Sequence, residues 1–574
     1  MNTDRKAAGN DLLSSTPHTS RSTPYLIPTW VLLLASGLLL GLAYPPNPVG
    51  LLGSIGLVPL LYALERAASV RQVFRWSYLS LLLFSALTSW WIGSWQAKTD
   101  PFLMISCVLL ILLHPLFFVL PLLFYHGIRR ARGTIQALIF LPFIWCGGEY
   151  LHALTDASYP WLTLGNTQTY NIYYIQFIEF TGVWGLSFLL VAQSATLAAM
   201  LLYPQRRTIK IGMVTLVLTL VPPYLYGFYV LGNAADRIPE RAITVTAVQP
   251  NEDPWEKWKA LDTVDHVRLN MELAETSLGG VRPDMFLWAE NAIPYTMTQP
   301  GGEGRRDAFY QAVDRLGVPV MTGFPDYLRY SDPASAPPSA KVDTVRDVMS
   351  GAVIEIIRYD HFNSVGLFVP GRGLTGAYHK MQLVPFGERI PFADDVPFLI
   401  SLLSWDVGIS SWAKGTDVAL FDVPTSKGTV KGGSVICIES IYPNVVRRFT
   451  ERGAEFLTII TNDGWYLGTP GPLQHERFAV LRAIENRRAI ARAANTGISC
   501  MVTPYGSIFA ETPEGIATTT SGTIEVRSDR TLYVIWGDWW PQLCLGIAAA
   551  LGGWAAAVGT AGRAGRRDGR DGGS

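Results

Sequence analysis

Long apolar runs separated by short polar loops occupy the first 231 residues of the chain. A helix of about 20 apolar residues crosses the hydrocarbon core of a bilayer. We therefore interpret seven of these runs, and an eighth near the C-terminal end, as membrane spans. The predicted spans are 25–43, 49–64, 77–96, 101–127, 134–154, 175–203, 210–231 and 533–560.

A polar region at 240–527 contains no run of this length. Short β-branched and aromatic runs alternate there with amphipathic patterns, which is typical of a layered α/β domain. Residues 327–348 are polar and proline-containing, so we expect an exposed loop that borders the site. The predicted strands are 242–249, 284–289, 318–323, 363–369, 373–379, 433–437, 455–461, 497–503 and 522–526, and the predicted helices are 256–278, 303–316, 441–453 and 473–495.

The charges of the loops predict the orientation. Lysine and arginine gather in the N-terminal leader, in every second short loop and after the last span, whereas the other short loops contain only Lys98. By the positive-inside rule both termini are then cytoplasmic, and seven spans place the 240–527 domain outside the membrane. The basic residues are Arg5, Lys6, Arg21, Arg66, Arg71, Arg75, Arg129, Arg130, Arg132, Arg206, Arg207, Lys210, Arg563, Arg566, Arg567 and Arg570.

The chain is thus predicted to have five parts. They are a cytoplasmic N-terminal segment, a seven-span transmembrane bundle, an extracytoplasmic domain, an eighth transmembrane helix and a disordered cytoplasmic tail, at 1–24, 25–231, 240–527, 533–560 and 561–574. The first run has an alternative interpretation as a cleaved signal peptide, but its polar leader is long and no A-x-A site follows it. Seven spans exceed what an anchor needs, so we favour a substrate-handling role for the bundle over simple anchoring.

Composition agrees with a membrane protein. Of the 574 residues 49% are hydrophobic and 16% charged, against about 25% charged in soluble domains. The formal net charge of zero gives no support for a nucleic-acid partner. The five cysteines form no CxxC pair and no Cys/His metal spacing, which excludes a disulfide-built scaffold and argues against a metal site.

Two carboxylates and a group of tryptophans in the predicted spans each have both a structural and a functional interpretation. Glu149 and Glu179 lie in or at the edge of spans, where a carboxylate is either functional or solvated near the outer end. Tryptophans at predicted outer ends are expected mainly to sit in the headgroup layer. They are Trp90, Trp91, Trp95, Trp161, Trp536, Trp539 and Trp540.

Three segments of the outer domain carry candidate chemistry. Glu290 ends a predicted strand, Lys380 follows another and precedes Glu388 by eight residues, and Cys437 ends a third. Singly, each has a plain interpretation as a helix cap, a solvated lysine or an inert buried thiol. Together they supply what acyl transfer needs: a thiol nucleophile, a carboxylate that moves its proton, and a cation that stabilises the oxyanion. A backbone N–H after Cys437 is a further candidate for the oxyanion.

These residues, in this order and context, resemble the Glu-Lys-Cys triad of the nitrilase superfamily. Nearly the whole chain is similar to its membrane branch, the bacterial apolipoprotein N-acyltransferases. The specific motifs are Tyr-His-Lys followed by Leu-Val-Pro-Phe-Gly-Glu at 378–388, Thr-Asn-Asp-Gly-Trp at 461–465, and Gly-Pro-Leu-Gln-His at 471–475 before an arginine-rich helix. The resemblance implies an α-β-β-α sandwich for the outer domain, beside a multi-span α-helical bundle.

The resemblance also implies a two-step reaction. A phospholipid donates its sn-1 acyl chain to Cys437, and the thioester passes the chain to the α-amine of a diacylglyceryl-cysteine lipoprotein. Glu290 would act as general base and then acid, while Lys380 would stabilise the oxyanion and help hold the thiolate. No metal or organic cofactor is implied. Phospholipid, lipoprotein and membrane lipids are the expected partners, without nucleic acid, and we expect a monomer.

Further positions match residues of the family. Glu388 matches its second essential glutamate, and Glu439 its carboxylate two residues after the nucleophile. Trp258 and Trp465 match tryptophans near the acyl site, with core or interfacial packing as the alternative. Ile438 stands where the family often has tyrosine, so a hydroxyl role there is absent or supplied elsewhere.

Two further details concern the surroundings of Cys437. Tyr466-Leu467-Gly468 differs from the Phe-Gly common in the family, which concerns the acyl pocket. Cys500 is expected to be a packed thiol, since a disulfide with Cys437 would block the nucleophile.

The expected location is the bacterial inner membrane, with the catalytic domain facing the periplasm. One alternative function is a membrane-tethered amidase that cleaves a small C–N substrate with the same triad. Another is a transporter or receptor with an outer binding domain, which would not need Cys437. The spans lack the repeated charged or helix-breaking pattern of a transport pathway.

Overall fold

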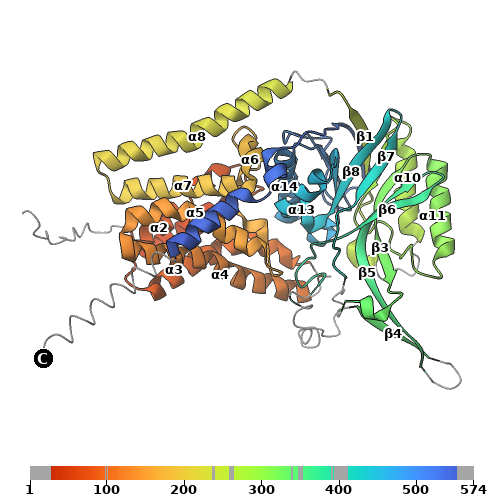
Figure 1. Ribbon diagram of the computed structural model, residues 1–574, viewed down its shortest axis with the longest axis horizontal. Coiled ribbons are helices and arrows are strands. Elements are labelled where there is room, and N and C mark those ends of the chain that lie inside the picture. Colours follow the sequence, from red (N-terminus) through yellow and green to blue (C-terminus); the bar gives the residue numbers. More distant parts are fainter. Residues whose placement is uncertain are drawn as a thin grey trace, which may run out of the picture.

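A computed structural model describes residues 27–96, 99, 101–235, 239–257, 264–337, 340–346, 353–389, 392 and 412–552. A bundle of helices from the N-terminal part lies beside an α/β domain, and the long helix axes run roughly along the line that joins the two parts (Figure 1). The helix that follows the α/β domain returns to the bundle (Figure 1). The chain therefore combines a helical membrane part with a separate sheet domain.

Four helices among the described residues are long and apolar enough to cross a membrane: Leu103–Arg132, Thr134–Ala153, Val183–Leu202 and Arg206–Ala234. The three earlier predicted spans form shorter or more polar elements. The helices of the bundle are α1 (Thr29–Leu42), α2 (Val58–Leu64), α3 (Val70–Ser89), α4 (Pro101–Arg132), α5 (Thr134–Ala153), α6 (Ile178–Thr181), α7 (Val183–Leu202) and α8 (Arg206–Ala235).

Glycines interrupt two of the predicted spans. The run predicted at 175–203 breaks at Gly182, whose φ of +65° ends α6 before α7 begins. The run predicted at 533–560 starts as the short helix α15 (Leu532–Trp536), stops at Gly537 (φ +63°) and resumes as a helix at 539–552. The remainder of that predicted span and the predicted tail lie outside the described residues. Hydropathy does not register these breaks because the flanking residues stay apolar.

The described part of the α/β domain contains two sheets, with strand orders β13-β1-β2-β3-β5-β4, where β6 also pairs with β5, and β12-β11-β10-β9-β8-β7. The strands are β1 (Ala242–Gln249), β2 (Met285–Trp288), β3 (Val320–Arg329), β4 (Lys341–Arg346), β5 (Val353–Val369), β6 (Gly373–His379), β7 (Leu420–Thr425), β8 (Gly428–Ile436), β9 (Phe456–Thr461), β10 (Ile490–Ala494), β11 (Cys500–Val502), β12 (Ile508–Phe509) and β13 (Thr518–Glu525).

The two sheets face each other and helices cover their outer sides. Met285 and Leu287 of β2 belong to the apolar cluster shared with the second sheet, whereas Phe286 and Trp288 pack in a cluster with α10 (Val264–Ser277) and α11 (Glu303–Leu316). This alternation is what the two-residue period of a strand requires when both faces are buried. With α13 (Pro443–Glu451) and α14 (Pro470–Asn486) beside the second sheet, the domain is the expected α-β-β-α sandwich (Figure 1).

Two local predictions were wrong. The helix predicted at 473–495 ends at Asn486, because Arg487 takes a left-handed conformation (φ +47°) and the chain continues as β10, parallel to β9. Residues 327–348 are not simply a loop, since Lys341–Arg346 forms β4. This strand pairs with the long β5 in an exposed arm (Figure 1). Backbone pairing with β5 satisfies the hydrogen bonds of this polar strand although little of it is buried.

Candidate active site

Glu290 lies two residues beyond β2, between the two sheets. Its carboxylate is buried and accepts three hydrogen bonds. Oε1 accepts from Asn363 Nδ2 (2.7 Å) and Lys380 Nζ (3.2 Å), and Oε2 accepts from the backbone N–H of Asn462 (3.0 Å). Gly323 of β3 allows this position, because a Cβ there would lie 2.8 Å from the Glu290 Cα. The carboxylate is therefore fixed from three sides.

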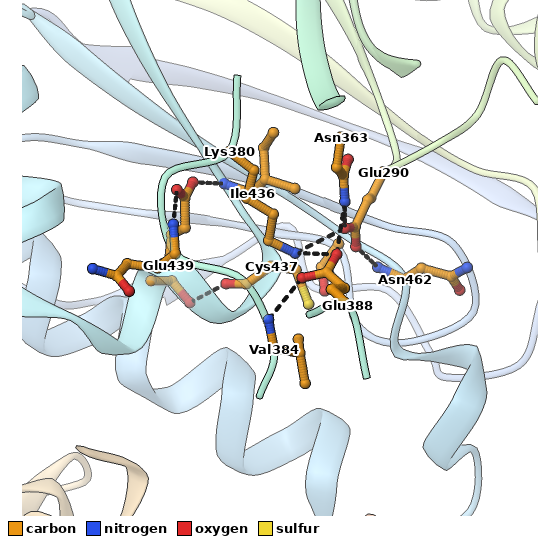
Figure 2. Close-up of polar contacts among 12 residues, drawn as sticks. Glu290, Asn363, Lys380, Val384, Glu388, Ile436, Cys437, Glu439 and Asn462 are labelled. Carbon is orange, nitrogen blue, oxygen red and sulfur yellow. Dashed lines mark hydrogen bonds and ion pairs between the residues drawn. The ribbon is translucent and has the colours of Figure 1, made fainter. Parts of the chain in front are cut away.

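Lys380 directly follows β6 and is almost completely buried. Its Nζ donates to Glu290 Oε1 (3.2 Å) and to Glu388 Oε1 (2.9 Å), so the ammonium lies between two carboxylates (Figure 2). Burial by itself lowers the pKa of this lysine, but Glu290, Glu388 and Cys437 outweigh it and hold the pKa well above its usual value. The side chain is a permanent cation with one N–H left for another acceptor.

Glu388 and Asn363 complete this cluster. Glu388 Oε2 accepts from the backbone N–H of Val384 (2.8 Å), which closes the loop after Lys380. Asn363, in β5, donates its Nδ2 to both Glu290 (2.7 Å) and Glu388 (3.0 Å). The sequence prediction missed Asn363, although it placed a strand beginning there. A polar amide at the start of an otherwise apolar strand was the available signal.

Cys437 lies where β8 turns into the short helix η7 (Cys437–Ile441), beside the Glu290–Lys380 pair (Figure 2). Its backbone φ of +51° is in the left-handed region, which residues other than glycine seldom adopt. Burial and the nearby Glu290 raise the pKa of the thiol, and Lys380 only partly opposes them. This direction favours the protonated thiol, and the expectation that Lys380 helps to hold a thiolate stays a prediction.

Glu439 is fully buried and ties the cysteine turn to the lysine loop. Oε2 accepts from Ile436 N (2.8 Å), while Oε1 accepts from the Tyr378 hydroxyl (2.7 Å) and from the backbone N–H groups of Met381 (2.6 Å) and Gln382 (3.1 Å). Burial raises the pKa of this carboxyl. Its donors are all on the residues that flank Cys437 and Lys380, so it braces the two loops against each other.

The two tryptophans singled out from the sequence have different outcomes. Trp465 lies half-buried in η8 (Asp463–Tyr466), with its ring edge-to-face against Trp255 at 4.7 Å between centroids. Trp258 lies outside the described residues. A role of either residue at the acyl site stays a prediction.

A second buried polar cluster lies behind Cys437. His475, in α14, is buried with its Nδ1 2.9 Å from Asp463 Oδ1 and its Nε2 2.8 Å from Ser440 Oγ. Arg492 donates to Asp463 Oδ2 (2.6 Å). Although burial raises the pKa of Asp463, Arg492 and His475 lower it to about 2, so this carboxyl is ionised. His475 ends the Gly-Pro-Leu-Gln-His motif at 471–475, but the motif alone did not predict a chemical role for it.

The same helix joins the domain to the bundle. Gln474 Oε1 accepts from the indoles of Trp161 (2.7 Å) and Trp91 (3.1 Å), and its Nε2 donates to the carbonyl of Pro45 (2.8 Å). The Tyr442 hydroxyl donates to the carbonyl of Ser158 (3.0 Å). At least two of the tryptophans predicted for the headgroup layer are therefore structural partners of the α/β domain.

Both carboxylates of the spans have partners. Glu149 Oε1 accepts from the Trp145 indole and from Leu164 N, each at 2.9 Å, so it fixes the turn after α5. Glu179 accepts from Arg487 Nε (2.7 Å) and from the Tyr226 hydroxyl. Both carboxylates thus have structural partners, and Glu149 is buried, so it is not the solvated carboxylate that was the alternative to a functional role.

Cys500 lies buried in β11, and both it and Cys437 are free thiols. Within the described ranges no group of three or more His, Cys, Asp or Glu side chains is arranged to hold a metal ion.

Comparisons with known proteins cover both parts of the chain. The family profile described as apolipoprotein N-acyltransferase N-terminal domain matches residues 36–196, and that described as carbon-nitrogen hydrolase matches residues 244–532. A curated relative from Chlorobaculum tepidum, named apolipoprotein N-acyltransferase, is 36% identical over 92% of this chain and 96% of its own length. One of the same name from Geobacter metallireducens is 28% identical over 91% and 94%.

Similar solved structures include Nit3 from Saccharomyces cerevisiae, a member of branch 10 of the nitrilase superfamily. It has 14% identity and a TM-score of 0.35, and the match covers 50% of this chain and 92% of that one. The identity to the curated relatives and their near-complete coverage carry the assignment. The chain belongs to the apolipoprotein N-acyltransferase family.

Proposed function

We propose that this protein transfers an acyl chain from a phospholipid to the α-amine of a diacylglyceryl-cysteine lipoprotein, through a thioester on Cys437. The observation that carries the proposal is the buried Glu290–Lys380 pair beside a thiol held in a left-handed turn. Family membership and the bundle of membrane helices support a lipid donor. The relatives' name supports a lipoprotein acceptor.

The first half-reaction forms the thioester. Because the pKa of the thiol is raised, Glu290 takes its proton as Sγ attacks the carbonyl carbon of the sn-1 ester. The carbonyl electron pair moves onto oxygen, where Lys380 Nζ and the N–H of Ile438 stabilise it. When the carbonyl reforms, the glycerol oxygen leaves with the proton that Glu290 returns. The products are the acyl-cysteine and a lysophospholipid.

The second half-reaction empties the enzyme. The neutral α-amine of the lipoprotein attacks the thioester carbonyl and gives a proton to Glu290. The carbon–sulfur bond then breaks, and the departing sulfur regains that proton. An amide forms on the lipoprotein and Cys437 returns to its resting state. The order donor, then acceptor, is the ping-pong scheme expected of a covalent acyl-enzyme.

The proposed location is the bacterial inner membrane, with residues 240–527 on the periplasmic side. The arginine-rich loops of the bundle support this orientation through the positive-inside rule. Since both substrates are anchored in lipid, a site next to the outer end of a membrane bundle suits them. The acyl ester and the acceptor amine then need only lateral diffusion to reach Cys437.

A two-substrate assay separates this function from the amidase alternative. Purified protein is incubated with phospholipid labelled in its sn-1 chain, with and without a diacylglyceryl dipeptide. We expect about one equivalent of lysophospholipid per protein without acceptor, and continued turnover with labelled lipopeptide when acceptor is present. Release of free labelled fatty acid that is unaffected by the lipopeptide would instead favour hydrolysis.

A further inference from the structure

The backbone carbonyl oxygen of Cys437 accepts hydrogen bonds from two buried side chains. Ser440 Oγ lies 2.9 Å from this oxygen and His475 Nε2 lies 3.1 Å from it. Ser440 and His475 are themselves 2.8 Å apart, and both are buried. The hydrogen-bond partners of Glu290 are Asn363, Lys380 and Asn462, so this cluster does not belong to the Glu290–Lys380 pair.

The carbonyl of Cys437 and the N–H of Ile438 belong to the same peptide group. Hydrogen bonds donated to a peptide oxygen polarise the group and strengthen the hydrogen bond that its N–H can donate. We propose that Ser440 and His475 are positioning residues that polarise and orient this peptide, so that the Ile438 N–H serves as the second oxyanion donor beside Lys380. This inference rests on the proposed acyl transfer.

The groups behind His475 support this role. The carbonyl of Cys437 can only accept a hydrogen bond, so Nε2 is the donor to it, while Nδ1 lies 2.9 Å from Asp463 Oδ1 and 3.3 Å from the Arg492 guanidinium. Asp463 is in turn fixed by Thr461 Oγ1 (2.9 Å) and by Arg492 (2.6 Å). The ring therefore cannot turn away without breaking several buried contacts.

The bundle also holds this ring. Trp161 packs on His475 with 5.5 Å between ring centroids, and the neighbouring Gln474 accepts from the indole of Trp161. The orientation of the oxyanion peptide thus depends on a residue of the membrane part. Ile438 offers a backbone N–H at this position and no hydroxyl, so the polarised peptide replaces the donor that a tyrosine would add.

The test compares two reactions of the same thiol. Acylation of Cys437 by a soluble p-nitrophenyl ester passes through an oxyanion, whereas alkylation by iodoacetamide does not. The variants are His475→Gln, His475→Ala and Ser440→Ala. Tyr442→Phe is the matched control. It removes a buried hydrogen bond to Ser158, at the interface between the domain and the bundle, without touching the Cys437 carbonyl. Thermal unfolding in detergent reports whether each variant folds.

We expect the acylation rate constant to fall by about 10- to 100-fold in the His475 variants and less in Ser440→Ala. The alkylation rate and the half-saturating ester concentration should stay within about twofold, and Tyr442→Phe should match the wild type in both reactions. Unchanged acylation in the Ser440 and His475 variants would overturn the inference. So would a parallel loss of acylation and alkylation, which indicates a disturbed thiol.

Repeating the acylation measurement with labelled phospholipid distinguishes a failure of this inference from a failure of the proposed function. If the wild type is acylated by the activated ester but never by phospholipid, the proposed donor is wrong while the oxyanion comparison remains valid. If the phospholipid reaction proceeds and the variants acylate normally with both donors, only the role of Ser440 and His475 fails.

Discussion

At the scale of single residues, the proposed chemistry begins with transfer of the Cys437 proton to Glu290. Burial and Glu290 raise the pKa of Cys437, and Lys380 lowers it. Replacing Glu290 with Gln removes a negative neighbour that disfavours the thiolate, so the pKa of the thiol should fall. We expect the pH midpoint of iodoacetamide alkylation to shift downward in Glu290→Gln, while acylation by phospholipid is lost.

Glu388→Gln is the matched control for that shift. Glu388 also binds Lys380 and Asn363, but it is not among the main groups that shift the pKa of the thiol. Its alkylation midpoint should move less than that of Glu290→Gln. An upward shift in Glu290→Gln, or acylation by phospholipid at the wild-type rate, would remove Glu290 from the role of base.

At the scale of elements, the approach of β3 to the end of β2 positions the base. A Cβ at Gly323 would meet the backbone of Glu290 at 2.8 Å and that of Asn291 still closer. We expect Gly323→Ala to displace Glu290 and to lower thioester formation by more than about 10-fold, since small misplacements of catalytic groups are costly. Single-turnover acylation with labelled phospholipid measures this effect.

Gly376→Ala provides the comparison on β6, the strand that leads to Lys380. A Cβ there would meet only the Phe421 ring, at an ordinary contact distance of 3.7 Å. Its acylation rate should stay close to that of the wild type. Equal rates in the two variants would contradict the claim that the close approach at Gly323 sets the position of Glu290.

Much of this architecture could be predicted from local patterns. The apolar runs located the helices of the bundle, and the strand-end positions located Glu290, Lys380 and Cys437. The boundary between α14 and β10 could not be found, because Arg487 leaves the helix through partners distant in sequence, Gln176 and Glu179. Asn363 was missed for the same reason, since its partners Glu290 and Glu388 come from other loops.

At the scale of the whole molecule, the hydrogen bonds of Gln474 join the domain to the helical bundle. Gln474→Ala would leave the Trp161 and Trp91 indoles without this acceptor and the Pro45 carbonyl without this donor. We expect the free energy of unfolding to fall by about 1–3 kcal/mol. Denaturant unfolding in detergent checks this, with Glu272→Gln on the exposed face of α10 as a control that should change little. An unchanged free energy of unfolding in Gln474→Ala would contradict a structural role for these hydrogen bonds.

Orientation across the membrane can be tested with introduced cysteines. Ser331→Cys lies at an exposed position of the domain, and Arg207→Cys at an exposed position in the first turn of α8, directly after the loop from α7. In intact spheroplasts a membrane-impermeant maleimide should label Ser331→Cys and leave Arg207→Cys unlabelled, and lysis should expose both. Labelling of Arg207→Cys before lysis would contradict the proposed orientation.

The central claim is that Cys437 carries the acyl chain. The most direct measurement is the intact mass of the protein after incubation with phospholipid in the absence of any lipoprotein acceptor. The wild type should gain one acyl group, which hydroxylamine releases and peptide mapping places on Cys437, and Cys437→Ala should gain none. An acyl group that persists in Cys437→Ala, or a wild type that turns over phospholipid into lipopeptide without ever carrying this group, would contradict the account.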